Sequence, residues 1–277
     1  MGLLVLDLDG VVWRGDRVID GSADAVARLQ AAGHDVVFCT NHAEPPALKR
    51  ALLDQMSLPD APVVTSAEAA LATCVAGEGV LVLGSVDFVS WAASIHDGSI
   101  CDPRSLEPFS DPPAVSTVIV GAHDDWDRDR IAIALVALRA GARFVATNTD
   151  PTFPVSAPDG RRWILPGNGA LVSAVSTACG RLPTVAGKPH QPMRDLLVAR
   201  FGRPDWVIGD VAETDGRLAR GLGCRFGLVL SGATTDPGDD PSGVVADLIG
   251  RDLAELVDVL LEDERRGAES PVRSGSG

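Results

Sequence analysis

A short apolar run that leads directly into two carboxylates is the most constraining feature of this sequence. Residues 3–13 read LLVLDLDGVVW, so Asp7 and Asp9 follow the apolar residues and stand one residue apart. A continuous apolar run of this kind is typical of a strand buried on both faces of a parallel sheet. Two like charges this close repel each other, and each loses hydration near a core. We therefore expect either a nearby positive charge or different tasks for the two acids.

Strand and helix patterns alternate along the first third of the chain. A helix is expected to begin near Ser22, which can cap it, and to end near Gly33. The run DVVFCTN then predicts a second buried strand that ends at Thr40 and Asn41. Strands separated by helices of this length favour a parallel sheet with right-handed crossovers, so the expected fold class is α/β.

The pattern restarts near Glu78 and returns to its first style near residue 184. Further strands are predicted at 80–84, 115–121, 142–148, 206–210 and 225–232, with helices after Gly169 and within 192–202 and 253–261. We interpret residues 1–76 and 184–262 as two parts of one core domain, with 77–183 as a separate α/β domain inserted between them. The polar residues 263–277, rich in Gly and Ser, are expected to be disordered.

Composition limits the classes of partner. The chain has 277 residues, of which 45% are hydrophobic, and a formal net charge of −14 at pH 7. This acidic balance disfavours nucleic acid, because phosphate neutralisation needs clustered Lys and Arg. The five cysteines form no CxxC pair, which is typical of free thiols in a reducing cytoplasm. No apolar run approaches the roughly 18 residues of a membrane span and no basic leader precedes the first strand, so we expect a cytoplasmic protein without membrane contact.

Polar side chains follow three of the predicted strands at the point where each strand ends. They are four carboxylates, one hydroxyl and one amide, contributed by Asp7, Asp9, Thr40, Asn41, Asp210 and Asp215. The carboxyl ends of the strands in an open parallel sheet form its binding crevice. Lys188 lies in AGKPHQPM, a loop that opens a helix, and can bring a positive charge to the same crevice.

Four short strings resemble, in the expected order, the four motifs of the haloacid dehalogenase superfamily: DLDGVVW, FCTNH, GKPH and GDVAETD. Residues 77–183 are similar to the C2-type cap that lies between the second and third motifs. The strings ATNTDPTFP, LPGNGALVSAV and GLVLSGATT resemble the branch of phosphoglycolate, glycerol phosphate, pyridoxal phosphate and 4-nitrophenyl phosphate phosphatases. The resemblance implies a Rossmann-like parallel-sheet core with an inserted α/β cap, and a Mg²⁺-dependent phosphatase for a small phosphorylated metabolite.

The resemblance also implies a role for each carboxylate. Asp7 is expected to attack phosphorus and form an aspartyl-phosphate, while Asp9 acts as general acid and base. Dehalogenases of the superfamily generally lack the second acid, so Asp9 favours phosphoryl chemistry. Mg²⁺ prefers oxygen ligands and is expected to bind the Asp7 and Asp210 carboxylates and the Asp9 backbone carbonyl. Asp215 would orient a metal-bound water or Lys188.

The phosphoryl oxygens are assigned by the same resemblance to donors from several segments. Thr40 is expected to donate a hydrogen bond to one oxygen, and backbone N–H groups near Leu8, Asp9 and Asn41 are expected to hold others. Lys188 is expected to neutralise the nucleophile and the phosphoryl group.

Four further residues are candidates for contact with the substrate. His42 stands where the branch usually has Asn, and His190 follows the lysine motif; each could meet the substrate or be an ordinary loop histidine. Asp150 in TNTD and Asn168 in PGNG are the candidates from the cap. Both also have a structural alternative, because Asp150 can stabilise a turn before Pro151 and Asn168 can belong to a helix start.

Two other functions stay open on the sequence. A phosphomutase or phosphotransferase would use a second alcohol in place of water, and a non-catalytic relative would bind a phosphorylated ligand without turnover. A P-loop nucleotide site is disfavoured, because no GxxxxGK[ST] motif occurs. Relatives with this cap often form dimers, which leaves a homodimer through the cap open.

Overall fold

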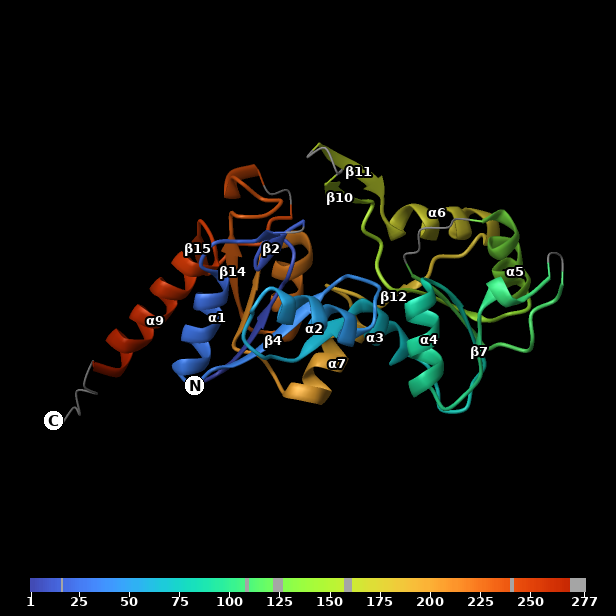
Figure 1. The fold of residues 1–277 in the computed structure, drawn as a ribbon, viewed down its shortest axis with the longest axis horizontal. Helices are drawn as coiled ribbons and strands as arrows, with labels where there is room; N and C mark the ends of the chain where they lie inside the picture. The colour runs from blue at the N-terminus through green and yellow to red at the C-terminus, as the bar shows by residue number, and fades with distance from the viewer. Residues whose placement is uncertain (16, 108–109, 122–126, 157–160, 240–241, 270–277) are drawn as a thin grey trace. The chain divides into compact units, whose positions relative to one another are not determined.

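The structure is a computed structural model that describes residues 1–15, 17–107, 110–121, 127–156, 161–239 and 242–269. The chain divides into two compact units, each built from separated segments (Figure 1). Unit 1 comprises Met1–Phe38, Asp54–Ala61 and the chain from Arg203 onward, and unit 2 comprises Cys39–Leu53 and Pro62–Gly202. The predicted domain boundaries at 76/77 and 183/184 differ from this division and stay a prediction.

Unit 1 contains a parallel sheet in which the strands follow the order β15-β14-β13-β1-β4. These strands are β1 (Leu3–Leu6), β4 (Asp35–Thr40), β13 (Trp206–Gly209), β14 (Arg225–Val229) and β15 (Leu248–Gly250). Leu4 of β1 lies opposite Trp206 on one side and Val36 on the other, so β1 is paired along both edges. Its side chains from Leu4 to Leu6 are at most 1% exposed, as expected for a strand covered on both faces. The predicted α/β class with a parallel-sheet core is confirmed.

Helices α1 (Ser22–Ala31) and α9 (Leu253–Glu269) pack against each other in unit 1, where Arg28 forms an ion pair with Asp258. Ser22 does not cap α1 as predicted. Gly21, with a φ of +80°, holds the N-cap position, and the Ser22 hydroxyl instead donates to the Ile19 carbonyl at 2.6 Å. The remaining elements of this unit are β2 (Trp13–Arg14), β3 (Arg17–Val18), a π-helical turn (Ala212–Gly216), α8 (Arg217–Leu222) and a 3₁₀ turn (Pro237–Asp239).

The end of α9 corrects the prediction of a disordered tail from residue 263. The helix continues through Glu269, because its last turns have partners. The Glu264 carboxylate lies 3.0 Å from the ring of the buried His34, and Arg266 pairs with Glu262 one turn earlier. Residues 270–277 of the predicted tail lie outside the described residues.

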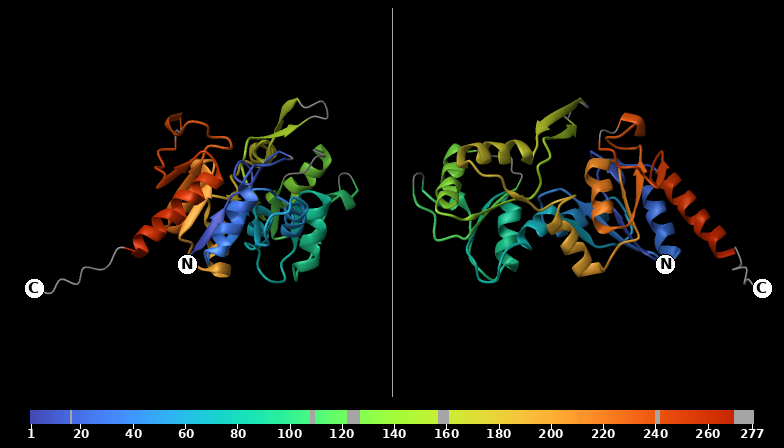
Figure 2. Two further views of the ribbon diagram at one scale, coloured as in Figure 1. Left: turned by 60° about the vertical axis from the view of Figure 1, so that its left-hand side comes forward. Right: turned by 180° about the vertical axis from the view of Figure 1, so that it is seen from behind.

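Unit 2 contains a second parallel sheet, in the order β12-β9-β8-β6-β7. Its strands are β6 (Val80–Leu83), β7 (Ile100–Cys101), β8 (Thr117–Val120), β9 (Arg143–Ala146) and β12 (Thr184–Val185). Helices α5 (Arg128–Arg139) and α6 (Asn168–Cys179) pack against each other and against β8, and α4 (Val86–Ile95) lies on the other side of the sheet (Figure 2). The predicted strands near 80, 115 and 142 therefore form one sheet.

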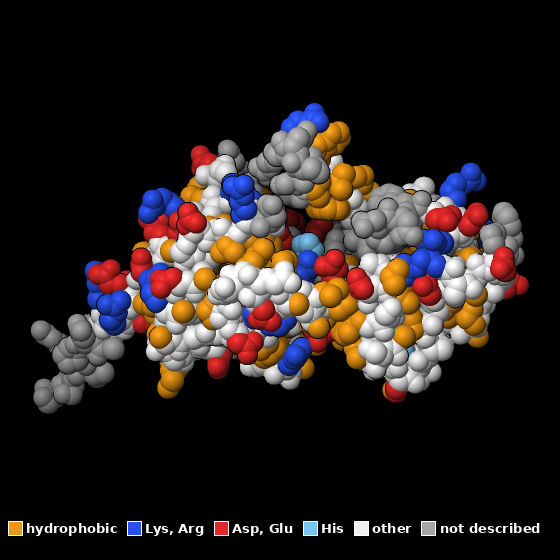
Figure 3. Space-filling model, in the orientation of Figure 1, with side chains coloured by type: hydrophobic (Ala, Val, Ile, Leu, Met, Phe, Trp, Pro, Cys, Tyr) orange, Lys and Arg blue, Asp and Glu red, His pale blue; other side chains and the backbone are white. Residues whose placement is uncertain are grey.

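The other elements of unit 2 include a two-stranded hairpin that the sequence pattern did not predict. Its strands are β10 (Thr152–Ser156) and β11 (Arg162–Pro166), and it exposes Phe153, Trp163, Ile164 and Leu165 (Figure 3). The rest are α2 (Pro46–Gln55), β5 (Val63–Thr65), α3 (Ser66–Leu71), a 3₁₀ turn (Pro103–Ser105) and α7 (Gln191–Phe201). No helix among the described residues is both long and apolar enough to cross a membrane.

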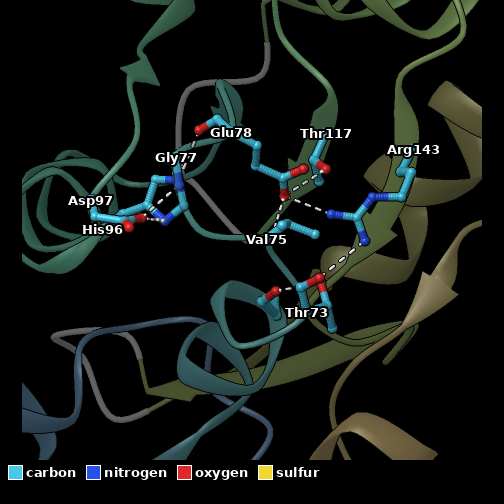
Figure 4. Close-up of polar contacts among 9 residues, drawn as sticks. Thr73, Val75, Gly77, Glu78, His96, Asp97, Thr117 and Arg143 are labelled. Atoms are coloured by element: carbon cyan, nitrogen blue, oxygen red, sulfur yellow. Dashed lines mark hydrogen bonds and ion pairs between the residues drawn. The ribbon is translucent and has the colours of Figure 1, made fainter.

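Glu78 joins the segment before β6 to two strands of the unit 2 sheet. Its carboxylate accepts hydrogen bonds from the Val75 backbone N–H at 2.9 Å, the Thr117 hydroxyl at 3.1 Å and Arg143 at 2.6 Å (Figure 4). Burial acts to raise the pKa of Glu78, but the hydrogen bonds, led by that from Val75, outweigh it and hold the pKa below its ordinary value. The segment is thereby fixed to the sheet by a charged group.

Candidate active site

Three carboxylates gather at the carboxyl ends of β1 and β13. Asp7 follows β1, Asp210 follows β13, and Asp215 lies on the π-helical turn, with one oxygen of each within 4.8 Å of the others. Asp210 and Asp215 are 5% and 1% exposed. The strand order reverses beside β1, since the chain moves first to β4 on one side and later to β13 on the other. Such a reversal point is the usual ligand crevice of an open parallel sheet.

Glycines make room for these carboxylates. A Cβ on Gly232 would lie 1.9 Å from an Asp210 oxygen, and one on Gly209 would lie 2.1 Å from the Asp215 carboxyl carbon. Gly10 combines a φ of +79° with the same crowding, since its Cβ would lie 2.3 Å from Asp210. The loop after β14 also holds Asp210 directly, because the Ala233 N–H donates to its carboxylate at 2.5 Å.

Asp9 has a different neighbour from the three clustered acids. The indole N–H of Trp13 donates to its carboxylate at 2.8 Å. The carbonyl of Leu8, directly before Asp9, accepts backbone N–H groups from Val12 at 2.9 Å and from Trp13 at 3.2 Å, which folds the chain into a tight turn. The two acids of DLDG therefore lie in different surroundings, which is the condition for giving them different protonation tasks.

Unit 2 holds the predicted lysine and its neighbours. Asn41 contacts both backbone groups of Lys188: its Oδ1 accepts the Lys188 N–H at 2.7 Å and its Nδ2 donates to the Lys188 carbonyl at 3.2 Å. Lys188 is 5% exposed. Thr40, at the end of β4, is 1% exposed, and its hydroxyl oxygen accepts the backbone N–H of His42 at 3.2 Å. The second and third motifs are thus joined by side-chain hydrogen bonds within this unit.

The four substrate candidates have distinct surroundings. The His42 carbonyl accepts the Ser66 N–H at 3.2 Å, and the Asp150 carboxylate accepts a weak bond of 3.5 Å from Asn41. His190 takes the N-cap position of α7 without a side-chain cap, and burial, followed by the charge of Arg194, lowers its pKa. A neutral imidazole is therefore expected at pH 7, not a second cation beside the lysine.

Asn168 is the first residue of α6, as its structural alternative predicts. It is 3% exposed, and its amide nitrogen donates to the Val120 carbonyl, the Thr147 hydroxyl and the Asn148 carbonyl at 3.2, 3.1 and 2.9 Å. The amide nitrogen is fully used by this network.

Sequence reasoning missed three residues that adjoin candidate site residues: Trp13 donates to Asp9, Asn148 donates to the Asn41 carbonyl, and Gly232 leaves room for Asp210. Trp13, Asn148 and Gly232 all lie inside or beside quoted motifs, but their importance depends on what faces them in the fold. Only the glycine carried a usable signal, because Gly at the end of a predicted strand can mark a close backbone approach.

Comparison with known proteins supplies the family. The family model described as haloacid dehalogenase-like hydrolase matches residues 4–95, and a second model of similar hydrolases matches residues 185–256. Chronophin from Mus musculus is 31% identical over 84% of this chain and 82% of its own length. The chain belongs to the haloacid dehalogenase-like hydrolases. The predicted superfamily is therefore confirmed.

The relatives of this hydrolase also agree on the class of reaction. D-glycerol 3-phosphate phosphatase from Mycobacterium tuberculosis is 33% identical over 84% of this chain, and the match spans 64% of that longer relative. A solved glycerol phosphate phosphatase from the same organism, in complex with magnesium, has a TM-score of 0.79 and 30% identity over 92% of this chain and 76% of its own. The predicted enzyme class, a phosphoric monoester hydrolase of the haloacid dehalogenase type, is confirmed.

Proposed function

We propose that this hydrolase is a Mg²⁺-dependent phosphatase that cleaves a small phosphomonoester through an aspartyl-phosphate on Asp7. The observation that carries the proposal is the cluster of Asp7, Asp210 and Asp215 at the reversal point of the unit 1 sheet. The names of the relatives support the reaction class, and glycerol phosphate is named both for a curated relative and for a solved structure from the same organism.

The carboxylate cluster suits a hard divalent cation. Three carboxylates with oxygens within 4.8 Å of one another repel unless a positive charge or a proton is shared among them. Oxygen donors of this kind are the ligands that Mg²⁺ prefers. Asp7, Asp210 and the Asp9 backbone carbonyl would hold the ion, which would hold a phosphoryl oxygen and reduce the repulsion between nucleophile and substrate. Asp215 would orient the ligands around it.

Asp7 and Asp9 would divide the chemistry between them. A carboxylate oxygen of Asp7 forms a bond to phosphorus as the bond to the alcohol oxygen breaks, while Asp9 gives its proton to that leaving oxygen. Asp9 then takes a proton from water, whose oxygen attacks the phosphorus of the aspartyl-phosphate and releases inorganic phosphate and free Asp7. The hydrogen bond from Trp13 would keep the Asp9 carboxyl in one orientation through both steps.

The roles of the unit 2 residues in this proposal rest on the family resemblance. Lys188 would neutralise charge on the phosphoryl group, Thr40 would donate to one of its oxygens, and N–H groups near Leu8, Asp9 and Asn41 would donate to others. Four residues remain candidates for contact with the leaving group of the substrate: His42, Asp150, Asn168 and His190. A homodimer through the cap also stays a prediction.

The first test is hydrolysis of 4-nitrophenyl phosphate by the purified protein. We expect turnover with Mg²⁺, none after chelation, and a loss of at least about a thousandfold in Asp7→Asn, since the nucleophile is removed. Asp24→Asn is the matched control, because Asp24 is an exposed carboxylate on α1 that pairs with Arg28 at 2.8 Å. Full activity in Asp7→Asn would refute the assignment of the nucleophile.

A panel of phosphorylated metabolites identifies the substrate. Glycerol phosphate, phosphoglycolate, pyridoxal phosphate and nucleoside monophosphates differ in the charge and size of the leaving group, and kcat/KM ranks them directly. Ligand-induced stabilisation without release of phosphate would instead favour a binding protein. Turnover that requires an acceptor alcohol would favour a phosphotransferase.

A further inference from the structure

A chain of side-chain amides connects the start of α6 to Lys188, entirely within unit 2. Asn168 donates to the Asn148 carbonyl at 2.9 Å, and Asn148 donates through its Nδ2 to the Asn41 carbonyl at 2.7 Å. Asn41 in turn holds the N–H and the carbonyl of Lys188. Asn148 and Asn168 are 5% and 3% exposed, so these bonds are shielded from competing water.

The orientation of the Asn148 amide is fixed from both ends. Its Oδ1 accepts the backbone N–H of Asp150 at 3.1 Å, so its Nδ2 must face the Asn41 carbonyl. A reversed amide would bring two donors together at one end and two acceptors at the other. Asn148 therefore acts as a donor toward Asn41 in only one arrangement.

The lysine loop has little freedom to compensate for a change in Asn41. The Gly187 N–H donates to the Thr147 carbonyl at 2.7 Å, and a Cβ on Gly187 would lie 2.5 Å from Asn41 Oδ1. The approach of the loop thus depends on the position of the Asn41 amide, because no other residue type fits at Gly187 without a shift.

We propose that Asn148 is a positioning residue for Lys188: together with the Ser66 hydroxyl, which also donates to the Asn41 carbonyl at 2.7 Å, it sets the position of the amide that clamps the lysine backbone. The catalytic consequence rests on the proposed function, in which Lys188 neutralises the phosphoryl group. The effect on the position of Lys188 does not rest on the proposed function, because it follows from hydrogen bonds within unit 2.

The isosteric variant Asn148→Asp tests the link. The variant keeps an acceptor for the Asp150 N–H but places a carboxylate oxygen against the Asn41 carbonyl, so Asn41 and the lysine loop must shift. We expect kcat to fall about tenfold or more with a smaller change in KM, as misplacement of a charge-stabilising group predicts. Asn148→Ala removes the donor without adding repulsion and replaces Asn148→Asp if that variant does not fold.

Hydrogen exchange measured by NMR tests the positioning without any turnover. In the wild type, the Lys188 N–H is bonded to Asn41 Oδ1 and exchanges slowly. In the Asn148 variants, that amide should exchange about tenfold faster, while the Ile119 amide of the β8 strand keeps its wild-type rate. Unchanged exchange at Lys188 in both variants would overturn the proposal, whatever the activity.

Thr117→Val is the matched control for general destabilisation of unit 2. Thr117 is fully buried, and its hydroxyl donates to Glu78 at 3.1 Å, away from the amide chain. The Thr117→Val variant should have a lower melting temperature but the wild-type kcat and the wild-type exchange rate at Lys188.

Two outcomes separate the positioning role from the proposed function. If the wild type is inactive on every phosphomonoester but Lys188 exchanges faster in Asn148→Asp, the proposed function is rejected and the positioning role is supported. An active wild type with unchanged kcat in Asn148→Asp would refute the catalytic consequence.

Discussion

The indole nitrogen of Trp13 and a carboxylate oxygen of Asp9 are joined by a 2.8 Å hydrogen bond across four residues of sequence. Trp13 is 2% exposed, so its ring is anchored in the hydrophobic core of unit 1. A carboxyl that gives and then takes a proton, as we propose for Asp9, benefits from a fixed orientation, and a buried indole supplies one without adding charge.

Trp13→Phe should therefore lower kcat without unfolding the protein. A hydrogen bond to a charged group contributes roughly 1.5–3 kcal/mol, and we expect a loss of about ten- to a hundredfold in kcat for 4-nitrophenyl phosphate. Trp91→Phe, on α4 of unit 2, is the same substitution in the unit that does not contain the three carboxylates, and it should keep wild-type kinetics. Equal kcat in Trp13→Phe and the wild type would show that this bond does not assist turnover.

Gly232→Ala should impair metal binding, because its Cβ would lie 1.9 Å from an Asp210 oxygen and must displace it. We expect a higher Mg²⁺ concentration for half-maximal activity and a loss of about a hundredfold in kcat, as for other small displacements of reacting groups. Titration of activity with Mg²⁺ measures both. Gly238→Ala is the control, since its Cβ would meet only the exposed Asp236 side chain at 3.2 Å. A wild-type Mg²⁺ titration for Gly232→Ala would contradict the role of this glycine.

Glu78→Gln should destabilise the protein at neutral pH by roughly 1–3 kcal/mol, because a neutral amide cannot satisfy the same three donors. The pKa of Glu78 is lowered in the folded protein, so its carboxylate stabilises the fold above the unfolded pKa near 4.5. That contribution is lost as the pH falls through the folded pKa. Urea unfolding of the wild type and of Glu78→Gln should show a difference in the free energy of unfolding at pH 7. This difference should become smaller below about pH 4.5.

Glu262→Gln is the matched control for this measurement. Glu262 forms an exposed ion pair with Arg266 on α9, and such pairs contribute about 0–1 kcal/mol. If the difference in unfolding free energy between the wild type and Glu78→Gln stayed constant from pH 7 to 3, the Glu78 carboxylate would not be the stabilising group.

Two cysteines should resist alkylation while the protein is folded. Burial, with a further contribution from Glu78, raises the pKa of Cys74 to about 12, and burial with the charge of Asp205 raises that of Cys224 to about 11. The reactive thiolate is therefore scarce at pH 8. Mass spectrometry after a short iodoacetamide pulse should find both thiols unmodified in the native protein and modified in urea. Rapid native labelling at either position would contradict the burial that raises these pKa values.

The parallel sheet of unit 1 and its carboxylates could be predicted from the sequence because the signals are local. Buried strands of a parallel sheet read as apolar runs, and the acids stand directly after them, as Asp7 and Asp210 do. Alternating strands and helices predict a parallel sheet whose strand ends share one edge, and the reversal of strand order beside β1, which only the structure shows, explains why these distant acids meet.

Other features depend on contacts that no local pattern records. The β10–β11 hairpin contains Pro154, which argues against a strand unless the strand is unpaired on one side. The last turns of α9 have the composition of a polar tail, and the contact between Glu264 and His34 that holds them cannot be read from the local sequence. Asn148 has no local signal at all, since its importance comes from a carbonyl more than a hundred residues away in sequence.

The position of β1 in its sheet has a consequence for the order in which this protein unfolds. Local opening in proteins starts at edges and termini, and β1 is sheltered by a neighbour on each side, whereas β15 ends the order. Asp7 follows directly from that sheltered strand, and its own N–H continues the ladder to Ile208 at 2.9 Å. Mild heating would therefore open the edge strand β15 before β1, and Asp7 would be displaced only when the whole sheet unfolds.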